Sequence, residues 1–285
     1  MYRSIVAGLT ALAVCWATPS AAEVDLKFPS QPERQVVLPG GFASGARLYA
    51  PAGPGPFPAA VLSHTCAGLG RNVFEWAQRL VAAGYVVLVI DHLGARGRKG
   101  NCYPDIRVSV TEFAQDQAAG LRHLRALPFV DRNRVVLMGY SFGAMAALRT
   151  ASASFQRKSL GGEHFAAVVA FYPWCNDIKG PANQDHQWNF YDDTTTPLLV
   201  ILGADDNEAD PRSCVDKAKA NAAKGMPVEY SVLPGTTHAF DNSGLGDRPL
   251  VFSRGGSTIT YRYNPGAVET AWRLTLDFFA RKGLR

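Results

Sequence analysis

The sequence is poor in charged residues and in cysteine. Charged residues make up 19% of its 285 residues and hydrophobic residues 47%, and there are five cysteines. This composition excludes an intrinsically disordered chain, a collagen-like chain and a coiled coil as descriptions of the whole protein. At this length a folded chain buries about 75% of its unfolded surface, so it has a substantial core without metal or disulfide support.

Long apolar runs and clusters of basic residues are also scarce. The one long apolar run lies at the extreme N-terminus, which excludes a multi-spanning membrane protein. Neither a CxxC pair nor an HExxH motif is present, so we expect no metal site. The basic residues are dispersed and form no polybasic tail, so we expect no nucleic-acid partner.

The N-terminal run has the layout of a secretory signal peptide. Arg3 supplies a positive charge, Ile5–Trp16 is apolar, and Ser20 and Ala22 are the small residues expected before a cleavage site. The apolar run is too short to span a membrane. We therefore expect a secreted or periplasmic protein that loses residues 1–22 and has no membrane attachment afterwards.

Removal of the signal peptide changes the charge and cysteine counts. Loss of Arg3 from the 29 basic residues leaves 28 against 24 acidic residues, a net charge of +4. Four cysteines remain, and in an oxidising compartment an even number predicts two disulfides with three possible pairings. These cysteines are Cys66, Cys102, Cys175 and Cys214.

Strand-like and helix-like segments alternate along the mature chain. Apolar runs predict buried strands at 58–63, 85–90, 134–138, 166–171, 198–202 and 227–233. Helical spacing predicts helices at 72–83, after a capping box of Ser109 and Glu112, at 211–224, and after Asn264. Buried strands that alternate with helices indicate a mainly parallel sheet covered on both faces. The predicted fold is a single α/β domain over residues 23–285.

Two stretches interrupt this alternation. Residues 173–197 are irregular and aromatic-rich, and residues 241–264 are rich in glycine and polar residues, with a hairpin expected from 249–252 and 258–263. Long insertions are commonly lids or binding loops, and length alone supports surface decoration equally well. Trp174 and its aromatic neighbours either line an apolar substrate pocket or pack within the insertion; the neighbours are Trp188, Phe190 and Tyr191.

The pentapeptide Gly139-Tyr-Ser-Phe-Gly143 has the form G-x-S-x-G. It directly follows a predicted buried strand and precedes a run of small residues typical of a helix start, which is the context of a nucleophile elbow. Serine on such a turn projects its oxygen, and the flanking glycines let neighbouring backbone approach closely. We therefore expect Ser141 to be a nucleophile.

A serine nucleophile needs a base and an orienting carboxylate, which follow it along the chain in this fold. Of the six histidines, only His238 lies in a loop directly after a late strand. The acid is expected after strand 198–202, where Asp205 and Asp206 are adjacent; we favour Asp206, with Asp210 a more distant alternative.

Two backbone amides are expected to bind the oxyanion of a tetrahedral intermediate. One is the amide of Phe142, directly after the nucleophile. The second comes from the loop after strand 58–63, where we favour Cys66 over Thr65.

With these residues located, the chain resembles the dienelactone hydrolase family of the α/β-hydrolase fold from about residue 45 onwards. The resemblance depends on the elbow and on four further motifs in the required order: His64-Thr-Cys-Ala-Gly68, Asp91-His-Leu-Gly-Ala-Arg-Gly97, Gly203-Ala-Asp-Asp206 and Pro234-Gly-Thr-Thr-His-Ala-Phe240. The family pattern places the acid three residues after the glycine, which supports Asp206.

The resemblance also has implications for binding and pairing. Dienelactone hydrolases proper use a cysteine nucleophile and a nearby glutamate, whereas this chain has Ser141 and begins the loop with His64. In the family an arginine can hold a substrate carboxylate, so Arg96 is either such a residue or the partner of Asp91 in an ion pair. Loop positions in the implied fold suggest the disulfides Cys66–Cys102 and Cys175–Cys214.

The expected activity is hydrolysis of small carboxylic esters or lactones through an acyl-enzyme, without metal or organic cofactor. The alternatives are acyl transfer or peptide cleavage by the same residues, and a non-catalytic binding protein on a hydrolase scaffold. The sequence gives no indication of oligomeric state.

Overall fold

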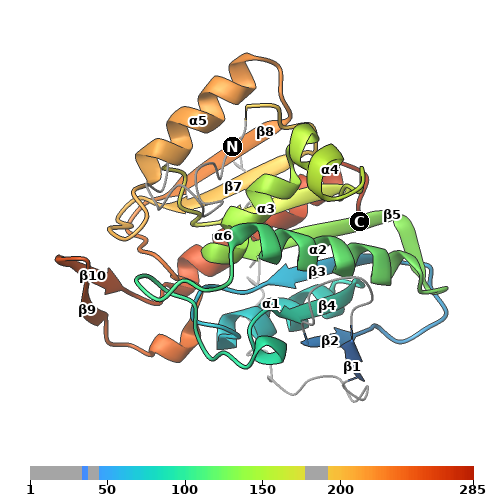
Figure 1. Cartoon of the computed structure of the whole chain (residues 1–285), viewed down its shortest axis with the longest axis horizontal. Coiled ribbons are helices and arrows are strands. Elements are labelled where there is room, and N and C mark those ends of the chain that lie inside the picture. The colour runs from blue at the N-terminus through green and yellow to red at the C-terminus, as the bar shows by residue number, and fades with distance from the viewer. Residues whose placement is uncertain (1–33, 38–44, 177–191) are drawn as a thin grey trace, which may run out of the picture.

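The computed structural model describes residues 34–37, 45–176 and 192–285 (Figure 1). The strands of its main sheet are β1 (Arg34–Val37), β2 (Gly45–Tyr49), β3 (Phe57–Ser63), β4 (Val86–Asp91), β5 (Val130–Tyr140), β6 (Ala167–Phe171), β7 (Leu198–Gly203) and β8 (Val228–Leu233). Their order across the sheet is β1-β2-β4-β3-β5-β6-β7-β8. The strands from β4 to β8 in this order are parallel, while β2 pairs antiparallel with both β1 and β4.

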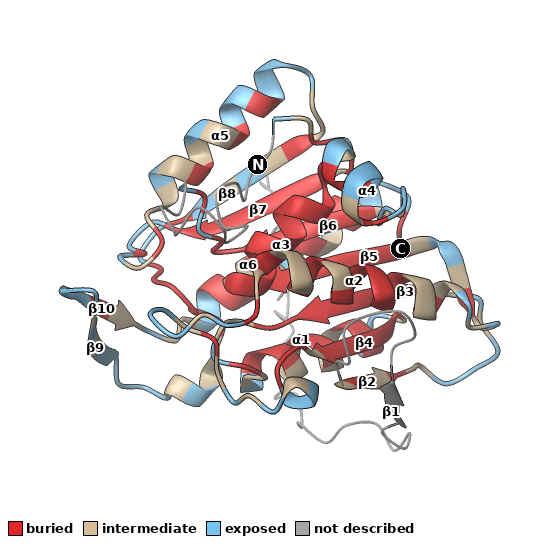
Figure 2. Cartoon of the chain, in the orientation of Figure 1, coloured by how far each residue is buried: buried red, intermediate tan, exposed pale blue. Residues whose placement is uncertain are grey.

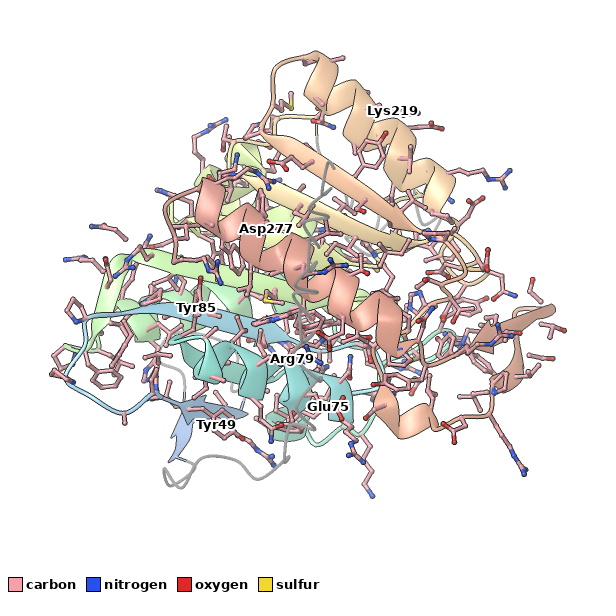
Figure 3. All side chains as sticks on the ribbon, turned by 180° about the vertical axis from the view of Figure 1, so that it is seen from behind. Tyr49, Glu75, Arg79, Tyr85, Lys219 and Asp277 are labelled. Atoms are coloured by element: carbon pink, nitrogen blue, oxygen red, sulfur yellow. A yellow bond between two sulfur atoms is a disulfide. The ribbon has the colours of Figure 1, made fainter. Side chains whose placement is uncertain are left out.

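Helices cover both faces of the sheet. They are α1 (Arg71–Ala82), α2 (Val110–Arg125), α3 (Phe142–Thr150), α4 (Ala153–Ser159), α5 (Pro211–Ala223) and α6 (Pro265–Arg281), with short 3-10 turns η1 (Gly94–Arg96) and η2 (Ser243–Leu245). Apolar side chains of α2, α3 and α5 pack on one face, and those of α1 and α6 pack on the other. Figure 3 shows the second face, where α6 and α1 lie in front of the sheet.

The central strands are buried on both sides, because their side chains alternate between two cores. In β4, Val86, Leu88 and Ile90 join the core under α2 and α3. Val87 and Val89 join the core under α1 and α6. Burial on both faces explains why these strands read as continuous apolar runs (Figure 2). The predicted α/β-hydrolase fold is confirmed.

The observed elements agree closely with the sequence predictions, with additions at the edges. The predicted capping box is present: the Ser109 side chain accepts from the Glu112 amide, and the Glu112 carboxylate accepts from the Ser109 amide. The sequence analysis located no strand before residue 58 and did not find α4. β2 was not predicted because it is half-exposed and antiparallel, and it therefore lacks the apolar run of the central strands.

The second interrupting stretch, 241–264, contains η2 and an antiparallel hairpin of β9 (Leu250–Arg254) and β10 (Ser257–Tyr261). This hairpin projects from the body of the molecule near the start of α6 (Figure 1). Of the first stretch, residues 177–191 lie outside the described residues, and with them Trp188, Phe190 and Tyr191. The predicted signal peptide, 1–22, also lies outside them. No helix in the described ranges is long and apolar enough to cross a membrane.

Two disulfides are present, with the pairing that the resemblance implied. Cys66 is bonded to Cys102, which joins the loop after β3 to the loop after η1. Cys175 is bonded to Cys214, which joins the segment after β6 to α5. Each bond therefore connects a loop at the carboxyl edge of the sheet to another part of the chain.

The Cys175–Cys214 disulfide closes a loop with a sequence separation of 39 residues. Because the cross-link limits the unfolded chain, the double variant Cys175→Ser/Cys214→Ser should lose about 2–4 kcal/mol of unfolding free energy. Urea denaturation followed by circular dichroism measures this loss. An unchanged midpoint and slope would show that this cross-link does not stabilise the fold.

Candidate active site

Ser141 lies on a tight turn between β5 and α3. Its backbone angles, φ 50° and ψ −111°, are strained for a residue with a side chain. A Cβ atom on Gly143 would lie 2.2 Å from the Ser63 carbonyl oxygen, and one on Gly139 would lie 2.4 Å from the Gly143 carbonyl oxygen. The two glycines are therefore required by close backbone approach on both sides of Ser141.

The structure brings Ser141, His238 and Asp206 into one hydrogen-bonded chain. His238 Nε2 lies 2.9 Å from Ser141 Oγ, and His238 Nδ1 lies 2.7 Å from Asp206 Oδ2. The other carboxylate oxygen of Asp206 accepts from the amides of Glu208 and Ala209. Because Asp206 accepts at Nδ1, that nitrogen carries the proton and Nε2 is free to accept one from Ser141.

The neighbouring carboxylates do not take this position. Asp205 is exposed. Asp210 caps α5, where it accepts from the Arg212 amide and pairs with the Arg212 guanidinium. Of the three acids considered from the sequence, Asp206 is thus the one in contact with His238.

Burial and charge act in opposite directions on His238. Burial alone would lower its pKa, but the contact with Asp206 and the nearby carboxylates of Glu208 and Asp241 outweigh burial and raise the pKa above its usual 6.5. The protonated imidazole is therefore stabilised by the residues around it. This arrangement suits a group that receives a proton and then releases it.

Two backbone amides are available near Ser141. Cys66 and Thr65 line the same cavity as Ser141, and Phe142 begins α3 directly after it. Among the described residues, no backbone carbonyl outside α3 accepts from the Cys66 amide or the Phe142 amide. The amide of Gly143 donates to the His64 carbonyl oxygen over 3.1 Å, which ties the loop after β3 to the elbow.

The loop after β3 is also fixed from its outer side. The Cys66 carbonyl oxygen accepts from the Asn101 amide over 2.7 Å, and the Cys66 side chain is disulfide-bonded to Cys102. These contacts hold the Cys66 backbone without using its amide. A donor fixed in this way loses little freedom when it binds an anionic oxygen.

A buried polar network supports the same loop from below. Ser63 Oγ lies 2.8 Å from His92 Nε2, and His92 Nδ1 lies 2.9 Å from Asp116, so these residues repeat the connectivity of the chain at Ser141. Gln117 donates to both Ser63 Oγ and the Gly143 carbonyl oxygen. All of these side chains are fully buried, so this second chain is a support and has no access to a substrate.

His64, the first residue of the loop, belongs to this support. Burial, assisted by neighbouring His92, lowers the pKa of His64 to about 3. Its Nε2 accepts from the His92 amide, and its Nδ1 donates to the Thr65 carbonyl oxygen. The imidazole is therefore neutral and its orientation is fixed.

Arg96 is placed differently from either expectation. Its guanidinium pairs with Asp116, with nitrogen–oxygen distances of 2.7 and 3.1 Å, and also donates to the His92 carbonyl oxygen. The expected ion pair with Asp91 is wrong, because the Asp91 carboxylate accepts instead from the amides of Leu93 and Gly94. Arg96 is also absent from the described residues that line the cavity at Ser141.

A cavity of about 350 Å³ opens at Ser141 and His238. It is lined by the loop after β3 and by the β9–β10 hairpin. Trp174, an expected pocket residue, is 37% exposed and does not line the described part of this cavity. The hairpin residues at the cavity are Leu250, Phe252, Arg254 and Tyr261.

The sequence analysis missed the group that anchors the His238 loop. The buried Asp241 carboxylate accepts from Tyr172 at 2.6 Å, Trp76 at 2.8 Å and Asn72 at 3.2 Å. The Tyr172 ring also packs edge-on against His238, with centroids 4.7 Å apart. These residues come from α1, the end of β6 and the loop after β8, so no local motif indicates that they meet.

No group of three metal-ligating side chains is found in the described ranges.

Several known proteins are similar to this chain. The quorum-quenching protein AidA of Acinetobacter baumannii is 33% identical over 47% of this chain and 41% of its own length. A probable 2-oxo-3-(5-oxofuran-2-ylidene)propanoate lactonase of Bradyrhizobium is 24% identical over 82% of this chain and 87% of that protein. The chain spans only 11–25% of the probable dipeptidyl-aminopeptidases B that it also matches.

Solved structures share the fold. A putative dienelactone hydrolase from Klebsiella pneumoniae superposes with a TM-score of 0.63 at 20% identity, covering 87% of this chain and 98% of that one. Thermogutta terrifontis esterase 2, phosphorylated by paraoxon, superposes with a TM-score of 0.66 at 16% identity, covering 90% and 96%.

The family assignment rests on the sequence itself. The profile of the dienelactone hydrolase family matches residues 45–283, which extend from β2 to the C-terminal side of α6 and include every residue of the site described above. The chain belongs to the dienelactone hydrolase family.

Proposed function

We propose that this protein is an exported serine hydrolase that cleaves small carboxylic esters or lactones through an acyl-enzyme. The observation that carries the proposal is the hydrogen-bonded chain from Ser141 through His238 to Asp206, which opens into the cavity of about 350 Å³. A nucleophile, a base and an orienting acid in contact are the parts that acyl transfer requires.

The reaction follows from these positions. Ser141 Oγ attacks the substrate carbonyl carbon while its proton passes to His238 Nε2, and Asp206 stabilises the resulting imidazolium. The Cys66 and Phe142 amides donate to the oxyanion, each contributing about 3–4 kcal/mol to the transition state. Collapse of the intermediate expels the alcohol, which takes the proton from His238. Water then attacks the acyl-enzyme carbonyl carbon while its proton passes to His238. The bond to Ser141 Oγ breaks as His238 returns this proton to Ser141, and the acid is released.

Export is part of the proposal and has two supports. The N-terminal 22 residues have the charge, apolar run and small residues of a signal peptide. Two disulfides are characteristic of an oxidising compartment. The chain covers 87% of a probable lactonase but only 11–25% of the probable dipeptidyl-aminopeptidases B, which favours oxygen esters over peptides as substrates.

A fluorophosphonate probe tests the nucleophile. Because the probe reacts with activated serine hydroxyls, the wild type should be labelled at one site per chain and Ser141→Ala should not be labelled. Intact-protein mass spectrometry measures the labelling, and circular dichroism checks the fold. Failure to label a folded wild type would favour the alternative of a non-catalytic binding protein.

The base assignment has its own test. His238→Ala should lower kcat for a p-nitrophenyl ester by about 10³-fold or more, because no other described side chain contacts Ser141 Oγ as a proton acceptor. The matched control is His164→Ala, which removes an exposed imidazole. Near-normal turnover by His238→Ala would refute the assignment.

The pH profile follows from the direction of the His238 pKa shift. His238 must be neutral to accept the proton, so kcat/KM should fall as the pH drops through a value above 6.5. Glu208→Gln removes a carboxylate that raises this pKa, so the acid limb should move to lower pH. Stopped-flow rates of the wild type and of Glu208→Gln across the pH range locate the acid limb of each protein. An acid limb at the same pH in both would show that Glu208 does not act on His238.

A further inference from the structure

A second carboxylate, Glu208, lies beside the proposed base. Glu208 Oε2 is 3.8 Å from His238 Nε2, the nitrogen that faces Ser141. The same oxygen accepts from the Tyr261 hydroxyl, and the other oxygen pairs with the Arg254 guanidinium. Glu208 thus connects the loop that carries Asp206 to the β9–β10 hairpin.

Arg254 is the positive charge of the cavity. Among the described residues that line the cavity, it is the one lysine or arginine. Its guanidinium lies 5.0 Å above the centre of the Phe252 ring and pairs with Glu208, and its side chain is 24% exposed. The other hairpin residues that line the cavity are apolar or aromatic: Leu250, Phe252 and Tyr261.

These charges determine which acyl groups the cavity can hold. A carboxylate on the substrate would find Arg254 already paired and Glu208 and Asp206 nearby, so it would lose hydration without gaining a partner. A neutral acyl chain meets the apolar side chains of the hairpin and needs no counter-charge.

We propose that Glu208 is a specificity-determining residue: by neutralising Arg254, it makes the cavity select neutral acyl groups and reject those that carry a carboxylate. This inference deepens the proposed function and rests on it. The substrate class is therefore neutral, small esters or lactones.

A series of charge variants tests the proposal. The substrates are p-nitrophenyl hexanoate and the mono-p-nitrophenyl ester of adipic acid, which have acyl chains of equal length and differ in a terminal carboxylate. The measured quantity is the ratio of kcat/KM for the anionic ester to that for the neutral ester, at a pH above the acid limb. A residue that only supports the fold would change both rates together and leave this ratio unaltered.

The expected order follows the charge of the pair. Glu208→Gln frees the Arg254 charge and should raise the ratio about tenfold or more, whereas Arg254→Gln leaves the Glu208 carboxylate without a counter-charge and should lower the ratio below the wild-type value. The double variant restores a neutral pair and should return the ratio close to wild type. The control Glu229→Gln removes a carboxylate on β8 that is paired with Arg281 of α6, and it should leave the ratio unchanged.

A ratio that stays at the wild-type value in Glu208→Gln would overturn the proposal. Ligand binding gives a test that does not need turnover. The ratio of the calorimetric dissociation constant for hexanamide to that for the monoamide of adipic acid should follow the same order across the variants. Absence of ester hydrolysis by the wild type would contradict the proposed function. A wrong order of binding would contradict the role of Glu208.

Discussion

The close approach of Gly143 to the end of β3 is the contact on which the candidate site depends. The Gly143 amide donates to the His64 carbonyl oxygen, and no side chain fits between Gly143 and Ser63. This contact brings the elbow, which carries Ser141, against the loop that carries Cys66. Because Ser141 follows β5 and Cys66, a proposed oxyanion donor, follows β3, the spacing of the two is fixed only while these backbone segments remain in contact.

Local motifs made much of this arrangement predictable from the sequence. The central strands read as apolar runs because both of their faces are buried, and the elbow is recognisable because a tight turn demands glycine at 139 and 143. Arg96 was misplaced because its partner, Asp116, lies 20 residues away on α2, a distance that no local pattern encodes. Glu208, Arg254 and Asp241 were missed for the same reason.

The β9–β10 hairpin gives the site its particular character. The parallel strands place Ser141, Asp206 and His238 at one edge of the sheet, whereas the hairpin supplies further residues that line the cavity. Its pairing with Glu208 places a charge-compensated pair beside His238. We therefore infer that the hairpin selects the substrate of the proposed reaction.

A crystal structure of the protein after reaction with a neutral alkyl phosphonate ester tests the central claim most directly. The account predicts a phosphorus atom bonded to Ser141 Oγ, with its phosphoryl oxygen accepting hydrogen bonds from the Cys66 and Phe142 amides and His238 close to the bond that forms. Phosphorus on another residue, or a phosphoryl oxygen directed away from both amides, would contradict it.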